Sequence, residues 1–91
     1  MQAHTIRDRV AFRSSLSPLK APAFSLLDSL QAHPADVQIE ALSLTFTILA
    51  QGAGLNPHEL VERSRRQLSD AAAVRNPIPE AIEAYAQGEL R

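Results

Sequence analysis

The chain has 91 residues, of which 45% are hydrophobic and none is cysteine, and its formal net charge is −1. This length predicts a single domain, and this apolar content excludes a disordered chain. The lack of cysteine excludes disulfides, thiolate metal sites and a cysteine nucleophile, and the near-neutral charge argues against a general nucleic-acid-binding protein.

A domain of this size is marginally stable by itself. Folding buries roughly 60–65% of the surface of such a short unfolded chain. We therefore expect oligomerisation to supply further stability. No secretory hydrophobic segment occurs near the N-terminus, so the expected location is the cytoplasm.

Residues 1–21 have no clean hydrophobic period, and Ser14, Ser15 and Pro18 are typical of a loop. The sequence predicts an irregular arm over 1–21, flexible or extended, followed by one helical domain over 22–91. The arm carries four basic residues against Asp8 alone. Two sharper interpretations stay open: a basic arm that contacts phosphate, and a strand that pairs across a dimer.

Residues 22–32 are predicted to form a short helix. Pro22 suits a first helical turn, and Leu26, Leu27 and Leu30 make one apolar stripe. His33 precedes Pro34, which disfavours helical backbone at that position and predicts a turn.

The longest apolar run lies in residues 37–50, VQIEALSLTFTILA, and it can be interpreted in two ways. Over 42–48 apolar residues alternate with hydroxyl residues, which is typical of a half-buried strand. The flanks favour a helix over 35–51, since Pro34 and Asp36 suit a helix start and Gly52 suits a helix stop. The run is also longer than the usual strand of about 5–6 residues.

As a helix, this segment is apolar nearly all round and must be covered on more than one side. A bilayer span is not expected, because that needs about 20 apolar residues. We expect a central buried helix that the other short helices cover in part and a second copy of the chain covers further. The sequence thus predicts a homodimer with an interface at Leu42, Leu44, Phe46, Ile48 and Leu49.

The strongest local signal predicts a helix that begins at Pro57 and continues to residue 73. Asn56 can cap it, Pro57 fits its first position, and Leu55 and Leu60 are placed as a hydrophobic staple. After a break at residues 75–79, Pro79 opens a last predicted helix over 79–87. The fold class expected is therefore all-α, a small four-helix domain with an orthogonal or bundle-like arrangement.

Residues 49–63 also invite a helix-turn-helix interpretation, which would make the chain a DNA-binding regulator. Arg63, however, falls where that motif usually buries an apolar residue. Glu59 and Glu62 near the start of the second helix would repel phosphate. Six arginines remain candidates for contact with a polyanion: Arg7, Arg9, Arg13, Arg63, Arg65 and Arg66.

No arrangement in the sequence predicts an enzyme. His4, His33 and His58 have no acid or nucleophile pattern around them, and the two-histidine zinc spacing is missing. We expect no catalytic residue, no metal and no cofactor. The favoured function is a non-enzymatic protein-interaction module.

The segments VQIEALSLTF at 37–46, GLNPHELVERSRR at 54–66 and AIEAYAQGELR at 81–91 resemble small uncharacterised proteins of bacterial phages and prophages. The resemblance implies a bacterial cytoplasmic setting and an accessory role. It implies no site residues.

Overall fold

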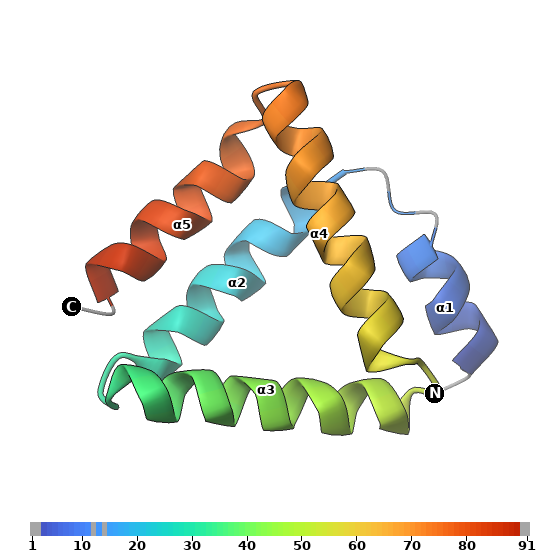
Figure 1. Ribbon diagram of the computed structural model, residues 1–91, viewed down its shortest axis with the longest axis horizontal. Helices are drawn as coiled ribbons and strands as arrows, with labels where there is room; N and C mark the ends of the chain where they lie inside the picture. The colour runs from blue at the N-terminus through green and yellow to red at the C-terminus, as the bar shows by residue number, and fades with distance from the viewer. Residues whose placement is uncertain (1–2, 12, 14, 90–91) are drawn as a thin grey trace.

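The computed structural model describes residues 3–11, 13 and 15–89, and over these residues the chain forms five helices and no strand. The fold is therefore all-α, as the sequence predicts (Figure 1). The helices are α1 (Ala3–Ala11), α2 (Ser17–Leu30), α3 (Ala35–Gly52), α4 (Pro57–Ala73) and α5 (Pro77–Glu89).

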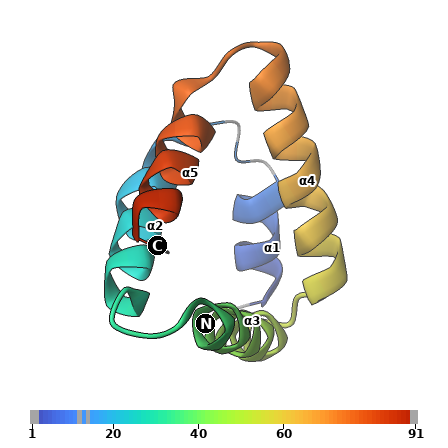
Figure 2. The same cartoon turned by 60° about the vertical axis from the view of Figure 1, so that its left-hand side comes forward.

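The helices form the sides of a triangle rather than a close-packed bundle (Figure 1). Helix α3 is one side and α4 the second, and α2 and α5 run side by side along the third (Figures 1 and 2). Helix α1 lies against the start of α4, where the Arg7 guanidinium donates to the Gly54 carbonyl at 3.4 Å. The Cα radius of gyration is 13.9 Å, whereas a compact chain of this length has about 12 Å.

Helices α2 and α5 are held together by an aromatic pair. The rings of Phe24 and Tyr85 stack with their centroids 4.6 Å apart and their planes 19° from parallel. The Lys20 ammonium lies 5.7 Å from the centre of the Phe24 ring, and the Tyr85 hydroxyl donates to the Asp28 carboxylate. The ring stack and the hydroxyl contact join α2 to α5, and Tyr85 and Asp28 are 57 residues apart in the sequence.

The start of α4 and the end of α3 follow from local chemistry. The Asn56 side chain accepts from the His58 amide at 2.9 Å, so the predicted cap and the predicted helix over 57–73 are confirmed. Helix α3 ends at Gly52, but Gly54 is the glycine with left-handed backbone, at φ 75°. The Leu55 amide then bonds to the Ala50 carbonyl at 2.8 Å, which closes the last turn of α3.

The predicted irregular arm over 1–21 is wrong in the described part, because Ala3–Ala11 is helical and α2 begins at Ser17 rather than at residue 22. Pro18 occupies the first turn of α2, where its missing N–H costs nothing. Because α2 begins at Ser17, Pro22 lies inside the helix and not at its start.

Two other predictions about α3 and α5 have different outcomes. The strand alternative for 42–48 is wrong, since α3 is a continuous helix over Ala35–Gly52. Helix α5 begins at Pro77, two residues before the predicted start, because Asn76 caps it by accepting from the Ile78 amide at 3.0 Å.

The single chain has almost no buried core. Among the residues with described side chains, only Ala50, Ala71 and Gln38 are buried. The expectation that α3 is a central buried helix is thus wrong for one chain. Its helices meet near their ends in a triangle, so none of them lies along the length of α3 on its outer side (Figure 1).

Candidate interaction surfaces

One face of α3 is a continuous stripe of exposed apolar side chains. Val37, Ala41, Leu44 and Ile48 recur every three or four residues and therefore share one side of the helix. Leu44 is 64% exposed, Ile48 60% and Val37 44%. We call these four residues the α3 seam. Exposed side chains of this size along a whole helix face are typical of an interface.

The five residues predicted for the dimer interface are divided between the seam and a second stripe. Leu44 and Ile48 belong to the seam, while Leu42 and Leu49 lie on the second stripe and are also exposed. Phe46 is half-buried within its own chain, so it is the least available of the five. Val37 and Ala41 were missed as candidates, although the helical period of the sequence contains the signal for them.

The accessible surface of the whole chain is larger than that of a typical folded monomer of the same mass. The accessible surface is 6899 Å² for 9.9 kDa, whereas folded monomers of this mass expose roughly 5,200 Å². The excess of roughly 1,700 Å² exceeds the ~800 Å² that each partner buries in a standard protein–protein interface. The excess belongs to the whole chain, including the inner sides of the triangle, and the seam contributes part of it.

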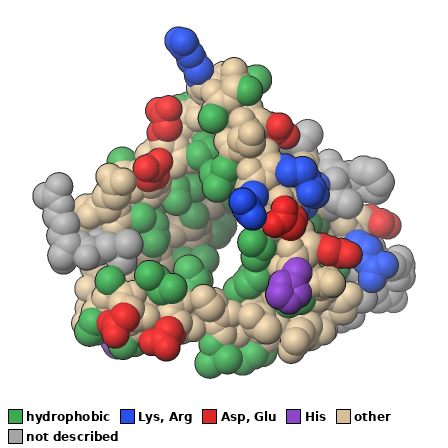
Figure 3. All heavy atoms as spheres, in the orientation of Figure 1, with side chains coloured by type: hydrophobic (Ala, Val, Ile, Leu, Met, Phe, Trp, Pro, Cys, Tyr) green, Lys and Arg blue, Asp and Glu red, His purple; other side chains and the backbone are tan. Residues whose placement is uncertain are grey.

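A second apolar surface, separate from the seam, is a hollow between α2, α4 and α5. It encloses about 440 Å³ and its apolar wall includes Leu19, Leu68, Ile78 and Ile82. The space-filling view shows an opening through the middle of the triangle with hydrophobic side chains around it (Figure 3). The inner sides of the helices therefore also present apolar surface.

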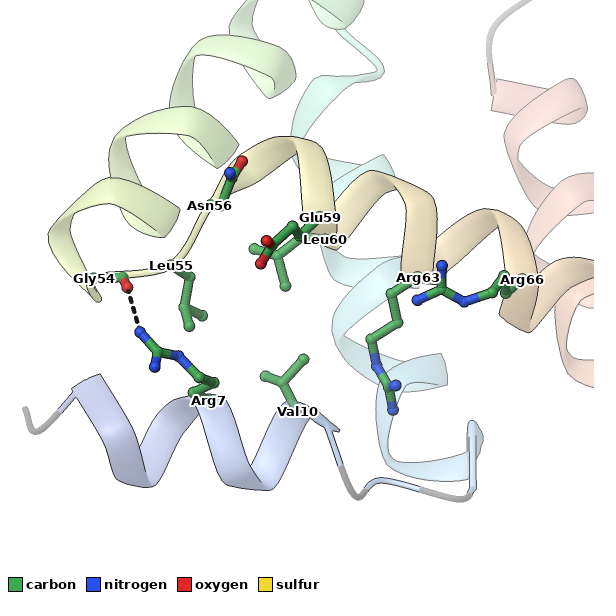
Figure 4. Close-up of a pocket in the computed structure, with 9 residues that line it drawn as sticks. All are labelled: Arg7, Val10, Gly54, Leu55, Asn56, Glu59, Leu60, Arg63 and Arg66. Atoms are coloured by element: carbon green, nitrogen blue, oxygen red, sulfur yellow. Dashed lines mark hydrogen bonds between the residues drawn. The ribbon is translucent and has the colours of Figure 1, made fainter.

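Charged residues gather elsewhere, in a groove of about 550 Å³ between α1 and the first half of α4 (Figure 4). Arg7 enters it from α1, and Arg63 and Arg66 enter it from α4. The Arg63 guanidinium also donates to the Arg13 carbonyl at 3.1 Å. Glu59 also lines the groove, so its wall carries one carboxylate as well as three guanidinium groups. Guanidinium groups held in this way can donate to a carboxylate or a phosphate.

Three of the six arginines predicted to contact a polyanion line this groove, namely Arg7, Arg63 and Arg66. Arg13 reaches it through its carbonyl contact with Arg63, and Arg9 is exposed outside the groove lining. Arg65 instead pairs with Glu62 on α4, with 3.1 Å between the guanidinium nitrogen and the carboxylate oxygen. The residues do not form one basic face.

In the helix-turn-helix interpretation α4 would be the recognition helix, but the start of α4 carries acidic side chains. His58, Glu59 and Glu62 are exposed in its first two turns. Carboxylates there would meet the phosphates of a bound duplex. The described part of the chain contains no group of three histidine or carboxylate side chains that could hold a metal ion.

None of the five helices, within the described ranges, is both long and apolar enough to cross a bilayer. Comparisons with protein-family models, with curated proteins and with solved structures found no match to this chain.

Proposed function

We propose that this chain is a non-enzymatic helical interaction module that works as a homodimer, with the second copy bound to α3. The observation that carries the proposal is the seam of Val37, Ala41, Leu44 and Ile48, which stays exposed after the chain has folded. Covering these side chains is favourable by roughly 25 cal/mol for each Å² of apolar surface removed from water.

The size of the chain supports the same conclusion. Only two apolar residues with described side chains, Ala50 and Ala71, are buried, so one copy gains little stability from its own core. Small domains with so little core depend on cross-links, metals or oligomerisation. The sequence contains no cysteine for a disulfide, and contact with a second copy would supply further stability.

The biological role that we propose is that of an accessory factor of a bacterial phage, acting in the cytoplasm on a host or phage protein. It is supported by the resemblance of residues 37–46, 54–66 and 81–91 to small phage proteins. Surfaces other than the seam remain free for that partner, including the apolar hollow between α2, α4 and α5.

Light scattering on the purified protein tests the homodimer. At micromolar concentration we expect twice the chain mass of 9.9 kDa, and on dilution we expect the mass to fall towards that of one chain. A mass of one chain throughout the micromolar range would contradict the proposal.

A second candidate function is DNA binding, favoured by the groove that Arg7, Arg63 and Arg66 line. Three phosphate contacts would weaken duplex binding roughly 40-fold between 50 and 200 mM salt. Fluorescence anisotropy with a random duplex measures this, and Arg66→Ala should flatten the salt dependence. Absence of binding at 50 mM salt would exclude this candidate.

A further inference from the structure

This inference rests on the homodimer proposed above and concerns how its two copies are oriented. We propose that the two α3 helices pair antiparallel through the seam. The two-fold axis passes between Ala41 and Leu44, so that Val37 faces Ile48 of the other copy and Ala41 faces Leu44 of the other copy. The occupant of the seam is thus a second copy of this chain, in one defined register.

The spacing of the seam is that of a two-helix contact. The steps from Val37 to Ala41, Leu44 and Ile48 are four, three and four residues, which alternate as the core positions of a heptad do. Ile39 falls at the outermost position of the same heptad and lies on the opposite side of α3. The seam covers about 16 Å of helix at 1.5 Å per residue, enough for four contact layers.

Side-chain volume favours the antiparallel sense. In a parallel pair Ala41 would face Ala41 and leave a gap, while the bulkier Leu44 and Ile48 would face their own copies. In the antiparallel register each Ala41 faces a Leu44 in the two inner layers, so a large residue fills the space beside each small one, and Val37 faces Ile48 in the two outer layers. Close packing without voids is the arrangement that a buried contact requires.

The charges at the two ends of α3 favour the same sense. Asp36 and Glu40 lie at its amino end, whereas Arg7 bonds to Gly54 just past its carboxyl end. A parallel pair would place the acidic ends side by side. The antiparallel pair separates the two Asp36 residues by roughly 20 Å along the axis and brings opposite ends of the helix dipoles together.

The occupant that we infer, a second copy of the chain, matches the seam in charge. The four seam residues are uncharged, and an antiparallel pair makes the surface complementary to itself, which is the property of a two-fold interface. The accessible surface exceeds that of a folded monomer of this mass by roughly 1,700 Å², and the exposed seam is part of that surface.

Disulfide trapping tests the orientation, because the chain has no cysteine of its own. The variants are Val37→Cys, Ile48→Cys, the double variant that carries both, and Ile39→Cys as the control on the far side of α3. A disulfide needs Cα atoms within about 7 Å. In the antiparallel register two copies of either single site are roughly 16 Å apart along the axis.

After mild oxidation we expect the double variant to give covalent dimer as its main species. Each single variant should give no more than Ile39→Cys gives. Covalent dimer from Val37→Cys alone, above the level of the control, would show a parallel pair and overturn the inference. A dimer by light scattering that the double variant fails to trap would also overturn it, while leaving the homodimer intact. If light scattering shows a monomer, both the homodimer and its antiparallel orientation are excluded.

Discussion

The substitution Leu44→Asp is expected to convert the dimer into single chains, the largest effect that the structure predicts. In the proposed pair Leu44 is covered by the other copy, so the new carboxylate would be buried without a partner. Removing such a charge from water costs several kcal/mol, and each 1.4 kcal/mol weakens association about tenfold. Light scattering at micromolar concentration should then give the 9.9 kDa of one chain.

Ile39→Asp is the matched control for this experiment. Ile39 is 61% exposed and Leu44 is 64% exposed, and both substitutions replace an aliphatic side chain of α3 by the same acid. Because Ile39 lies away from the seam, its variant should remain dimeric. Circular dichroism should show helical content in both variants, since neither position is buried within the chain. A dimeric Leu44→Asp variant would show that the seam is not the contact.

Phe24→Ala is expected to give the largest loss of stability within the chain, about 2–3 kcal/mol. Removal of a fully buried phenylalanine costs roughly 3–5 kcal/mol, and Phe24 is half-buried. The loss includes the stacking on Tyr85, which contributes about 0.5–1.5 kcal/mol. Thermal unfolding at a fixed protein concentration should show Tm lowered by roughly 10–15 °C.

Tyr85→Phe is the control for the aromatic pair, since it keeps the ring and removes only the hydroxyl that donates to Asp28. A single hydrogen bond contributes about 0.5–1.5 kcal/mol, so this variant should lose less stability than Phe24→Ala. The reverse order would mean that the hydroxyl, and not the ring stack, holds α2 against α5.

The α3 seam and the arginine groove differ in their geometry and their charge. The seam has continuous exposed apolar area on one rigid helix, and the helix fixes its geometry. The arginine groove is assembled from α1 and α4, and it contains Glu59 together with Arg7, Arg63 and Arg66. Its net positive charge is therefore small, so protein association is the stronger of the two proposals.

The sequence alone determined the elements whose signals lie within one helical turn. Asn56, Pro57 and Glu59 are neighbours in the chain, so cap, first position and first turn could be recognised, and α4 begins at Pro57 as predicted. Pro34 likewise marked the start of α3 at Ala35, but the helix runs one residue past its predicted end at 51, through Gly52, and the left-handed glycine that follows it is Gly54. The helical repeat of 3.6 residues also contained the signal for the apolar stripe on α3, although Val37 and Ala41 were not among the predicted interface residues.

The tertiary structure alone decided how these helices are arranged. The contacts that place α1 against α4, from Arg7 to Gly54 and from Arg63 to Arg13, join residues 47 and 50 positions apart. The stack of Phe24 on Tyr85 likewise joins distant helices. No short-range pattern encodes such pairings, because they depend on how the turns aim each helix. That arrangement leaves the α3 seam uncovered, because the other helices contact α3 only near its ends, and this exposure is what supports a dimer.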